Sequence, residues 1–239
     1  MVGRMTEVSE QRKVTTGEAK PRRSSVERIL EAARECLGES GTAAFSTRAV
    51  AERAEVPLSQ IHYHFQSKQQ LLLRVLAEEN AALVVRQREM FEGPGSFAEK
   101  WDRACDYLES DLGSGYVRRL HELFGQAYAD PVVALELRGM VAGWLAAIAD
   151  LVRRSLRPET LARVGLSPEA FAAIAGGAFL GAESMILIGM GESEVPNRQG
   201  LRQVGRWIAV LEARQASADR DGQRSNVGRL SGGSSDAGA

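Results

Sequence analysis

Apolar residues recur at the three-and-four spacing of an α-helix along nearly the whole chain, and no stretch shows the alternation of a β-strand. Proline, which lacks an N–H and disrupts a helix interior, stands between these stretches rather than inside them. The prolines at expected helix boundaries are Pro57, Pro94, Pro131, Pro158, Pro168 and Pro196. The sequence therefore predicts an all-α fold made of many separate helices.

The spacing predicts a helix that begins near Ser24 and is ended by Gly38 and Gly41, and a two-turn helix from Ser46. Further helices are expected at about 58–64, 67–91, 97–111, 114–129, 132–156, 168–189 and 198–215. A domain boundary is predicted inside the 67–91 helix, ahead of a Gly-Pro-Gly-Ser hinge at 93–96. This gives an N-terminal domain of residues 24–75 and a larger helical domain of residues 76–215.

The two ends of the chain are predicted to lack regular structure. Residues 1–23 are polar and charged without an apolar period, which is typical of a flexible arm, and residues 216–239 are rich in Gly, Ser and Asp, as disordered tails are. The arm has no apolar core of a secretory signal. Cys36 and Cys105 lie among apolar residues at helical spacing, as buried thiols in a reducing compartment do. We therefore expect a cytoplasmic protein.

One stretch, residues 171–190, has the composition of a membrane span. Its length matches the ~20 residues that a span needs, and Glu183 is its only charged residue. No Lys/Arg flank or aromatic belt accompanies it. We therefore expect a helix buried inside the protein and no membrane partner.

The two short helices near 46–54 and 58–64 are joined by a tight turn of three or four residues. This is the geometry of a helix-turn-helix, whose second helix enters the DNA major groove; a small helical subdomain without a ligand is the alternative. Residues 1–75 carry 12 Lys/Arg against 9 Asp/Glu, whereas the remainder carries 18 against 22. A polyanion contact is therefore expected in the N-terminal part.

The sequence LSQIHYHFQSKQQLL at residues 58–72 concentrates polar and aromatic side chains on the second of these helices. Ile61 and Phe65 are four residues apart and can be buried on one face. The outer face is then left with Ser59, Gln60, Tyr63 and His64. These side chains can bond bases and phosphates, and no acid stands among them to repel DNA.

Lys68 is expected in the first turn of the next helix, where a cation opposes the helix dipole at a cost of ~0.3–1 kcal/mol. A bound phosphate would reverse the sign of this term, although a solvated surface lysine is the alternative. A metal site is the other interpretation of the local histidines. His62 and His64 are two residues apart and point in different directions on a helix, and no cysteine is nearby. We expect no metal and no cofactor.

Residues 24–76 resemble the TetR/AcrR family of transcriptional regulators. The resemblance depends on STRAVAERAEV followed by IHYHFQSKQQLL. It implies DNA contacts by Ser46, Thr47, Arg48, Leu58, Ser59, Gln60, His62, Tyr63, His64 and Lys68. Two positions depart from the family pattern: Glu55 stands where the family usually has Gly, and His62 where it usually has Tyr.

For the C-terminal domain, the resemblance implies an effector pocket and a homodimer. Candidate pocket residues are Trp101, Cys105, Tyr107, Tyr116, His121, Phe124, Tyr128, Met140 and Trp144, for which an ordinary core is the alternative. Candidate dimer residues on the last two helices are Gly177, Gly181, Met185, Val204, Trp207, Ile208 and Leu211, for which an intramolecular core is the alternative.

The resulting hypothesis is a homodimeric repressor that binds a two-fold symmetric DNA operator and is released by a small, largely apolar effector. The alternative is a DNA-binding regulator without an effector, whose C-terminal domain only dimerises or binds a protein partner. An enzyme is not expected. The chain has no glycine-rich phosphate loop after a strand, no Gly-x-Ser-x-Gly motif and no paired metal ligands.

Overall fold

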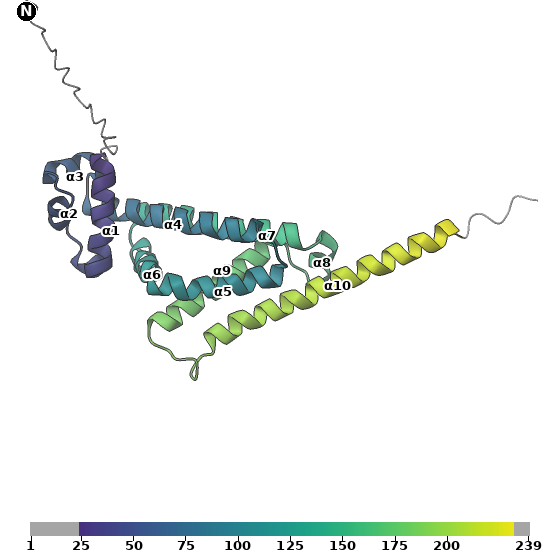
Figure 1. Cartoon of the computed structure of the whole chain (residues 1–239). Helices are drawn as coiled ribbons and strands as arrows, with labels where there is room; N and C mark the ends of the chain where they lie inside the picture. Colours follow the sequence, from purple (N-terminus) through teal and green to yellow (C-terminus); the bar gives the residue numbers. More distant parts are fainter. Residues whose placement is uncertain (1–23, 232–239) are drawn as a thin grey trace, which may run out of the picture.

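The computed structural model describes residues 24–231, and their side chains as far as residue 220. In this part of the chain the helices are joined by short loops and no strand is present, which confirms the predicted all-α fold (Figure 1). The helices are α1 Ser25–Ala44, α2 Thr47–Arg53, α3 Leu58–Phe65, α4 Lys68–Glu92, α5 Phe97–Gly113, α6 Tyr116–Ala127, α7 Pro131–Ser155, α8 Pro158–Arg163, α9 Pro168–Leu187 and α10 Asn197–Ser231. The predicted arm, residues 1–23, lies outside the described residues.

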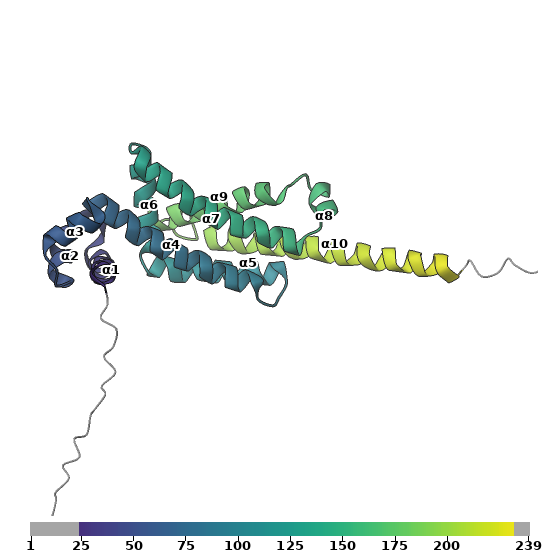
Figure 2. The same ribbon diagram turned by 90° about the horizontal axis from the view of Figure 1, so that it is seen from above.

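Helices α1 to α3 form a small head at one end of an elongated bundle made by α4 to α10 (Figures 1 and 2). Helix α4 begins in the head and continues into the bundle, so it belongs to both parts. Helix α10 runs along the bundle and projects beyond its far end (Figure 2).

Two buried clusters hold these parts together. The first begins with Ile29, Val50 and Ile61 in the head and continues through α4 to Leu137 on α7. The second joins α5, α7, α9 and α10. The first cluster contains residues of both the head and the bundle. The two parts are therefore packed together across the predicted boundary near residue 75.

The helices differ from the sequence prediction in three places. Helix α1 passes Gly38 and kinks at Gly41, where φ is 67° and ψ is −177°. The short helix α8 was not predicted. Helix α10 continues to Ser231, so residues 216–231 are helical rather than part of the predicted tail, and 232–239 lie outside the described residues. Extending an existing helix costs much less than starting one, which explains why this segment is helical without an apolar stripe.

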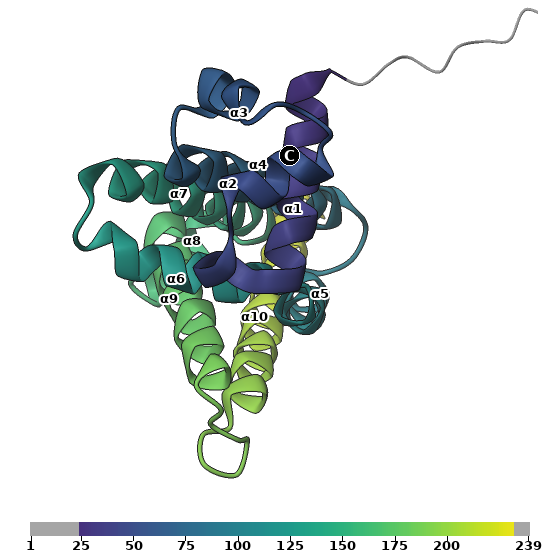
Figure 3. The ribbon, with the colours of Figure 1, turned by 90° about the vertical axis from the view of Figure 1, so that its left-hand side faces the viewer.

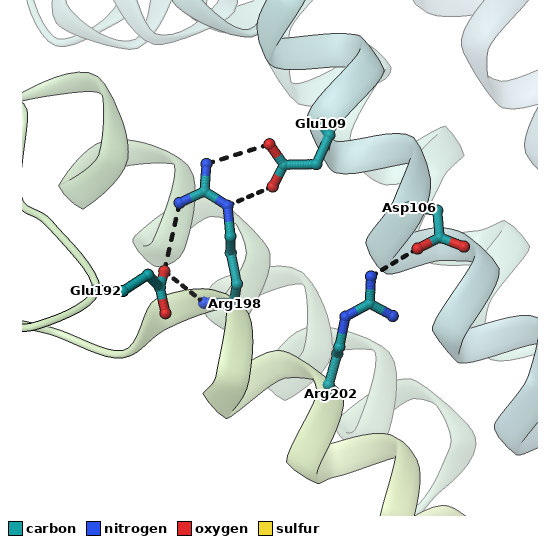
Figure 4. A network of polar contacts seen from close by, with 5 residues as sticks. All are labelled: Asp106, Glu109, Glu192, Arg198 and Arg202. Carbon is teal, nitrogen blue, oxygen red and sulfur yellow. Dashed lines mark hydrogen bonds and ion pairs between the residues drawn. The ribbon is translucent and has the colours of Figure 1, made fainter.

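Helix α10 is fastened to α5 by exposed ion pairs, which Figure 4 shows, and by a hydrogen bond that caps the start of α5. Arg198 contacts Glu109 and Glu192, and Arg202 contacts Asp106 at 2.6 Å. Near the other end of α5, the Glu212 carboxylate accepts a hydrogen bond of 2.7 Å from the Phe97 N–H. Exposed pairs contribute little energy each, so their main effect is to fix the register of the two helices.

Helices α7 and α9 are each long and apolar enough to cross a membrane. Both contribute residues to the second buried cluster, where they pack against each other and against α5 and α10. The stretch that resembled a span is therefore mostly helix α9 of this bundle.

The turn between α2 and α3 places Glu55 in the left-handed region, with φ at 52°. This conformation costs a residue with a Cβ ~1–2 kcal/mol, whereas a glycine avoids the strain but adds ~0.4–1 kcal/mol of unfolded-state entropy. We therefore expect Glu55→Gly to raise the free energy of unfolding by about 0.5–1 kcal/mol in urea denaturation. Glu55→Ala removes the same charge but keeps the Cβ, so an equal gain in that variant would show that charge, not strain, is responsible.

Candidate functional site

Helix α3 presents the predicted reading face to solvent. Ile61 and Phe65 are buried and fix the helix on the core of the head. Ser59, His62, Tyr63 and His64 are exposed, and Tyr63 is 82% exposed. A tyrosine this exposed makes almost no contribution to the protein's own packing, so it is free to contact a ligand.

Gln60 and Leu58 differ from the other residues of this face because both are half-buried. Leu58 packs against the first buried cluster. The Oε1 atom of Gln60 is buried and has no hydrogen-bond partner among the described residues. The prediction that Gln60 points outward was therefore only partly right, because its amide oxygen is turned toward the protein.

Two residues that are predicted to contact the DNA backbone, His64 and Lys68, lie close to the starts of other helices. His64 Nε2 lies 3.3 Å from Ser25 Oγ at the start of α1. Lys68 Nζ lies 5.9 Å from the centre of the Phe45 ring, just before α2. Ser46 at the start of α2 makes no side-chain cap bond, and its hydroxyl is available to an outside group.

The other predicted residues of the head are also accessible. Arg48 is exposed, and Thr47 is half-buried at the first position of α2. No group of three His, Cys, Asp or Glu side chains in the described part of the chain could hold a metal ion. The head thus offers hydroxyl, imidazole, phenol and ammonium groups to a partner, and no acid stands between Glu55 and Glu78.

A narrow cavity lies among α4, α5, α6, α7 and α9. Its volume, counted as the space that the centre of a water molecule can occupy, is about 60 Å³. Its lining residues are Asn80, Leu83, Gln87, Phe91, Phe97, Trp101, Ala104, Leu108, Asp111, Tyr116, Val117, Leu120, Met140, Val141, Trp144, Ile148, Leu151, Phe179, Leu180 and Glu183. This wall is apolar and aromatic with a few polar groups, the usual composition of a small-molecule site.

Four of the nine predicted pocket residues, Trp101, Tyr116, Met140 and Trp144, line the cavity. Hydrogen bonds fix the side chains of two of these residues. Trp101 Nε1 donates to the Leu201 carbonyl at 2.7 Å, and the Tyr116 hydroxyl donates to Asn80 Oδ1 at 2.9 Å. Burial raises the pKa of the Tyr116 phenol. The tyrosine therefore keeps its hydroxyl proton, which it donates to Asn80 Oδ1.

The other five predicted pocket residues do not line the cavity. Cys105 is buried in the second cluster, and burial raises the pKa of its thiol to about 11, which makes it unreactive. The Tyr107 ring is covered by the Arg86 guanidinium at 4.2 Å. Phe124 packs on the first cluster, and Tyr128 is 87% exposed. Helical spacing alone could not separate these positions from the true lining residues.

His121, the fifth of these residues, lies behind the cavity wall and contacts one of its members. Its Nε2 atom is 3.0 Å from Glu183 Oε2, and its Nδ1 atom is 3.2 Å from Ser184 Oγ. The Ser184 hydroxyl donates to the Leu180 carbonyl at 2.8 Å, so it is occupied and is not a free nucleophile. Burial raises the pKa of the Glu183 carboxyl, although the hydrogen bond from His121 opposes this shift.

Polar residues of the wall were missed by the sequence analysis. Asn80 and Gln87 lie seven residues apart on α4, and Glu183 lies on α9. Asp111 is held by Arg86, whose guanidinium donates to both carboxylate oxygens at 2.7 and 2.8 Å. The available signal was the presence of polar residues at inward positions of apolar stripes.

The predicted dimer residues fall into two groups. A Cβ added at Gly177 or Gly181 on α9 would meet nothing within 4 Å, and Met185 and Trp207 are 38% and 61% exposed. Ile208 is 1% exposed, so its assignment to a dimer surface was wrong. Val204 and Leu211 are partly buried against the second buried cluster, to which Ile208 belongs. The stripe on α10 faces inward because it covers α5.

An exposed apolar surface nevertheless remains on α9 and α10, which lie side by side (Figure 3). Besides the residues already predicted, it includes Ile174 at 63%, Ile188 at 73% and Val210 at 49% exposed. Large apolar side chains exposed on two adjacent helices are typical of a protein–protein contact surface.

Comparison with known proteins gives consistent results for the head and the fold. Residues 29–75 match the model for bacterial regulatory proteins of the tetR family. The chain is 30% identical over 109 residues to the HTH-type transcriptional regulator UidR of Escherichia coli strain K12, covering 46% of this chain. The matched part spans about half the length of that relative, 48%.

Solved structures resemble most of the chain. A protein from Rhodococcus sp. that is described as a TetR-family transcriptional regulator superimposes with a TM-score of 0.62 at 21% identity, covering 77% of this chain and 97% of the other. A protein from Saccharomonospora viridis described as a transcriptional regulator, in complex with choline, gives 0.58 at 20% identity, covering 75% and 94%. At these identities the likeness shows a shared fold. Residues 29–75, which form most of the helix-turn-helix head, are thus a domain of the tetR family of bacterial regulatory proteins, and the described part of the chain shares its all-α fold with these solved structures.

Proposed function

We propose that this protein is a homodimeric, cytoplasmic transcriptional repressor that a small-molecule effector releases from its DNA operator. The observation that carries the proposal is the path of helix α4. Its first residue, Lys68, lies in the head, and Asn80, Leu83, Gln87 and Phe91 of the same helix line the cavity. A ligand that displaces this wall therefore acts on the element that supports the reading face.

On DNA, α3 would lie in the major groove, with Ser59 and Tyr63 directed toward base edges, and Gln60 would join them by turning its amide group outward. Ser46, Thr47, Arg48 and Lys68 would contact phosphates on either side, together with His62 and His64. The exposure of Tyr63 and the position of Lys68 at the start of α4 support this arrangement. Phosphate contacts fix the register, and base contacts determine the sequence that is bound.

The exposed apolar surface of α9 and α10 supports the homodimer. Two copies of these helices would make a four-helix contact, with Gly177 and Gly181 allowing close approach of the backbones. A two-fold arrangement presents two α3 helices to successive major grooves, which lie about 34–36 Å apart. The operator would accordingly have two-fold symmetry.

The small cavity supports an effector that acts by changing the shape of the bundle. Ligand pockets usually have volumes of ~300–1,000 Å³, and this cavity admits only a few water molecules. A ligand must therefore separate the helices as it binds. Coupling free energies of ~1–3 kcal/mol are typical of such regulators, equivalent to a change of roughly 5–150-fold in DNA affinity. The choline complex of the structural relative supports a small organic ligand for a protein of this fold.

DNA footprinting on the region flanking the protein's own gene is the direct test. We expect protection of a two-fold symmetric site, because each dimer presents two reading helices. A small-molecule screen by thermal shift, followed by DNA release, then tests the effector. Binding to DNA without release by any stabilising compound would favour the alternative regulator without an effector, and no binding to genomic fragments at low salt would contradict the proposal as a whole.

A further inference from the structure

The charged groups of the cavity wall are all acidic. Its polar residues are Asn80, Gln87, Asp111, Tyr116 and Glu183, and its only charged residues are the two acids. None of the residues that line it is a lysine, arginine, histidine, serine or threonine. The Tyr116 hydroxyl is already used, because it donates to Asn80. A ligand in this cavity therefore meets two acids and no cationic side chain among the lining residues.

Gln87 is the clearest unsatisfied acceptor. Its side chain is 8% exposed and lines the cavity from α4. Its Oε1 atom is buried and has no hydrogen-bond partner among the described residues. A buried acceptor without a donor is costly to the fold, since the protein has given up the hydrogen bond that water would supply. A ligand N–H would restore that bond.

Glu183 supplies an acidic group on the same wall. It is 9% exposed, and its described side-chain contact uses one oxygen, Oε2, toward His121. His121 adds positive charge there only when it is protonated. Asp111, by comparison, has both oxygens bonded to Arg86. Glu183 is therefore the lining acid best able to accept a hydrogen bond from a ligand.

Aromatic rings make up much of the remaining wall. Trp101 and Trp144 both pack against Phe179, with ring centres 5.4 and 6.2 Å apart. The faces of such rings attract cations, and their area favours an apolar body. Acceptors, one available acid and aromatic faces are together the features that recognise an organic ammonium group.

We propose that the effector is an apolar amine in its protonated form, whose ammonium group donates to Gln87 Oε1 and Glu183 while its hydrocarbon body lies among Trp101, Trp144 and Phe179. This inference rests on the proposed effector function and narrows the class of ligand. Carboxylates and phosphates are excluded, because they would bring negative charge to a wall whose charged residues are both acids.

The test uses the full-length protein and matched ligands that differ only in their polar group. Amines, alcohols and carboxylates are compared on bodies of increasing size, beginning with phenylbutylamine, phenylbutanol and phenylbutyrate. Binding is measured by thermal shift and by the fluorescence of the tryptophans. We expect the amine to bind about tenfold more tightly than the alcohol on each body that fits, because a charged hydrogen bond is stronger than a neutral one. Equal binding of alcohol or carboxylate, or no binding of any amine, would overturn the proposal.

Two substitutions separate recognition from folding. Gln87→Met removes the unpaired acceptor, so it should raise the melting temperature of the free protein and weaken amine binding about tenfold. Glu183→Gln keeps the shape and a hydrogen bond to His121, and should weaken the amine but not the alcohol. Glu79→Gln is the control, because Glu79 lies on α4 but pairs with Arg119 and does not line the cavity. Unchanged amine binding in both cavity variants would refute the assigned contacts.

DNA release, measured with the same ligands, distinguishes this inference from the function on which it rests. Preferred binding of amines without release of DNA would confirm the ligand class and contradict the effector role. Release by alcohols or carboxylates as readily as by amines would support the effector role and contradict the amine.

Discussion

Replacing Tyr63 with glutamate is expected to lower operator affinity by about 100-fold or more, because it removes a contact to DNA and places a carboxylate against phosphate. Fold stability should be unchanged, since Tyr63 is 82% exposed on α3. Fluorescence anisotropy with labelled operator DNA at fixed salt measures the effect. This is one of the two largest changes that the structure predicts.

Tyr128 provides a matched control for this substitution. It is 87% exposed and lies at the end of α6, outside helices α1 to α3. Tyr128→Glu makes the same chemical change and should leave DNA affinity within about twofold, since a single added charge outside the reading face acts mainly through a screened field. If both variants lose affinity equally, net charge rather than the α3 contact explains the loss.

Gly181→Arg is expected to convert the protein to a monomer. A Cβ at Gly181 meets nothing within 4 Å inside the protomer, so the fold should tolerate the change, whereas an arginine would prevent close approach of two α9 helices. Binding to a two-fold site should then fall by about 100-fold or more, because the second head loses its high local concentration. Analytical ultracentrifugation measures the mass, and anisotropy measures the affinity.

Gly139→Arg is the control for the dimer test. Gly139 is an exposed helical glycine on α7, and a Cβ there also meets nothing within 4 Å. This variant should keep the mass and DNA affinity of the parent. A Gly181→Arg protein that remained dimeric would place the interface elsewhere on the molecule.

The sequence predicted the parts of the fold that depend on local pattern. The burial of Ile61 and Phe65 and the exposure of Tyr63 follow from spacing on one short helix. By contrast, Ile208 was assigned to a partner surface and is instead buried. An apolar stripe shows that a helix face is covered, but not whether the same chain or another one covers it.

The cavity was less accessible to sequence reasoning, for a related reason. Trp144 and Tyr128 are both aromatic residues on helices of the C-terminal domain, and only one of them lines the cavity. The wall is assembled from five helices, so membership depends on how the helices are rotated against one another. Gln87 and Glu183 were missed because single polar residues in apolar stripes look like ordinary variation until their surroundings are known.

Because helix α4 is continuous, a small rotation of it at the cavity becomes a larger displacement at its start in the head. Gln87 at the cavity lies 19 residues from Lys68, or roughly 28 Å along the axis at the usual rise per residue. Pivoting this rod by about 5° near the cavity would swing its other end by roughly 2.5 Å. In the proposed dimer, such a displacement in each subunit is close to the length of a hydrogen bond. A slight separation of the bundle helices at the cavity can thus carry the two reading helices out of register with the grooves.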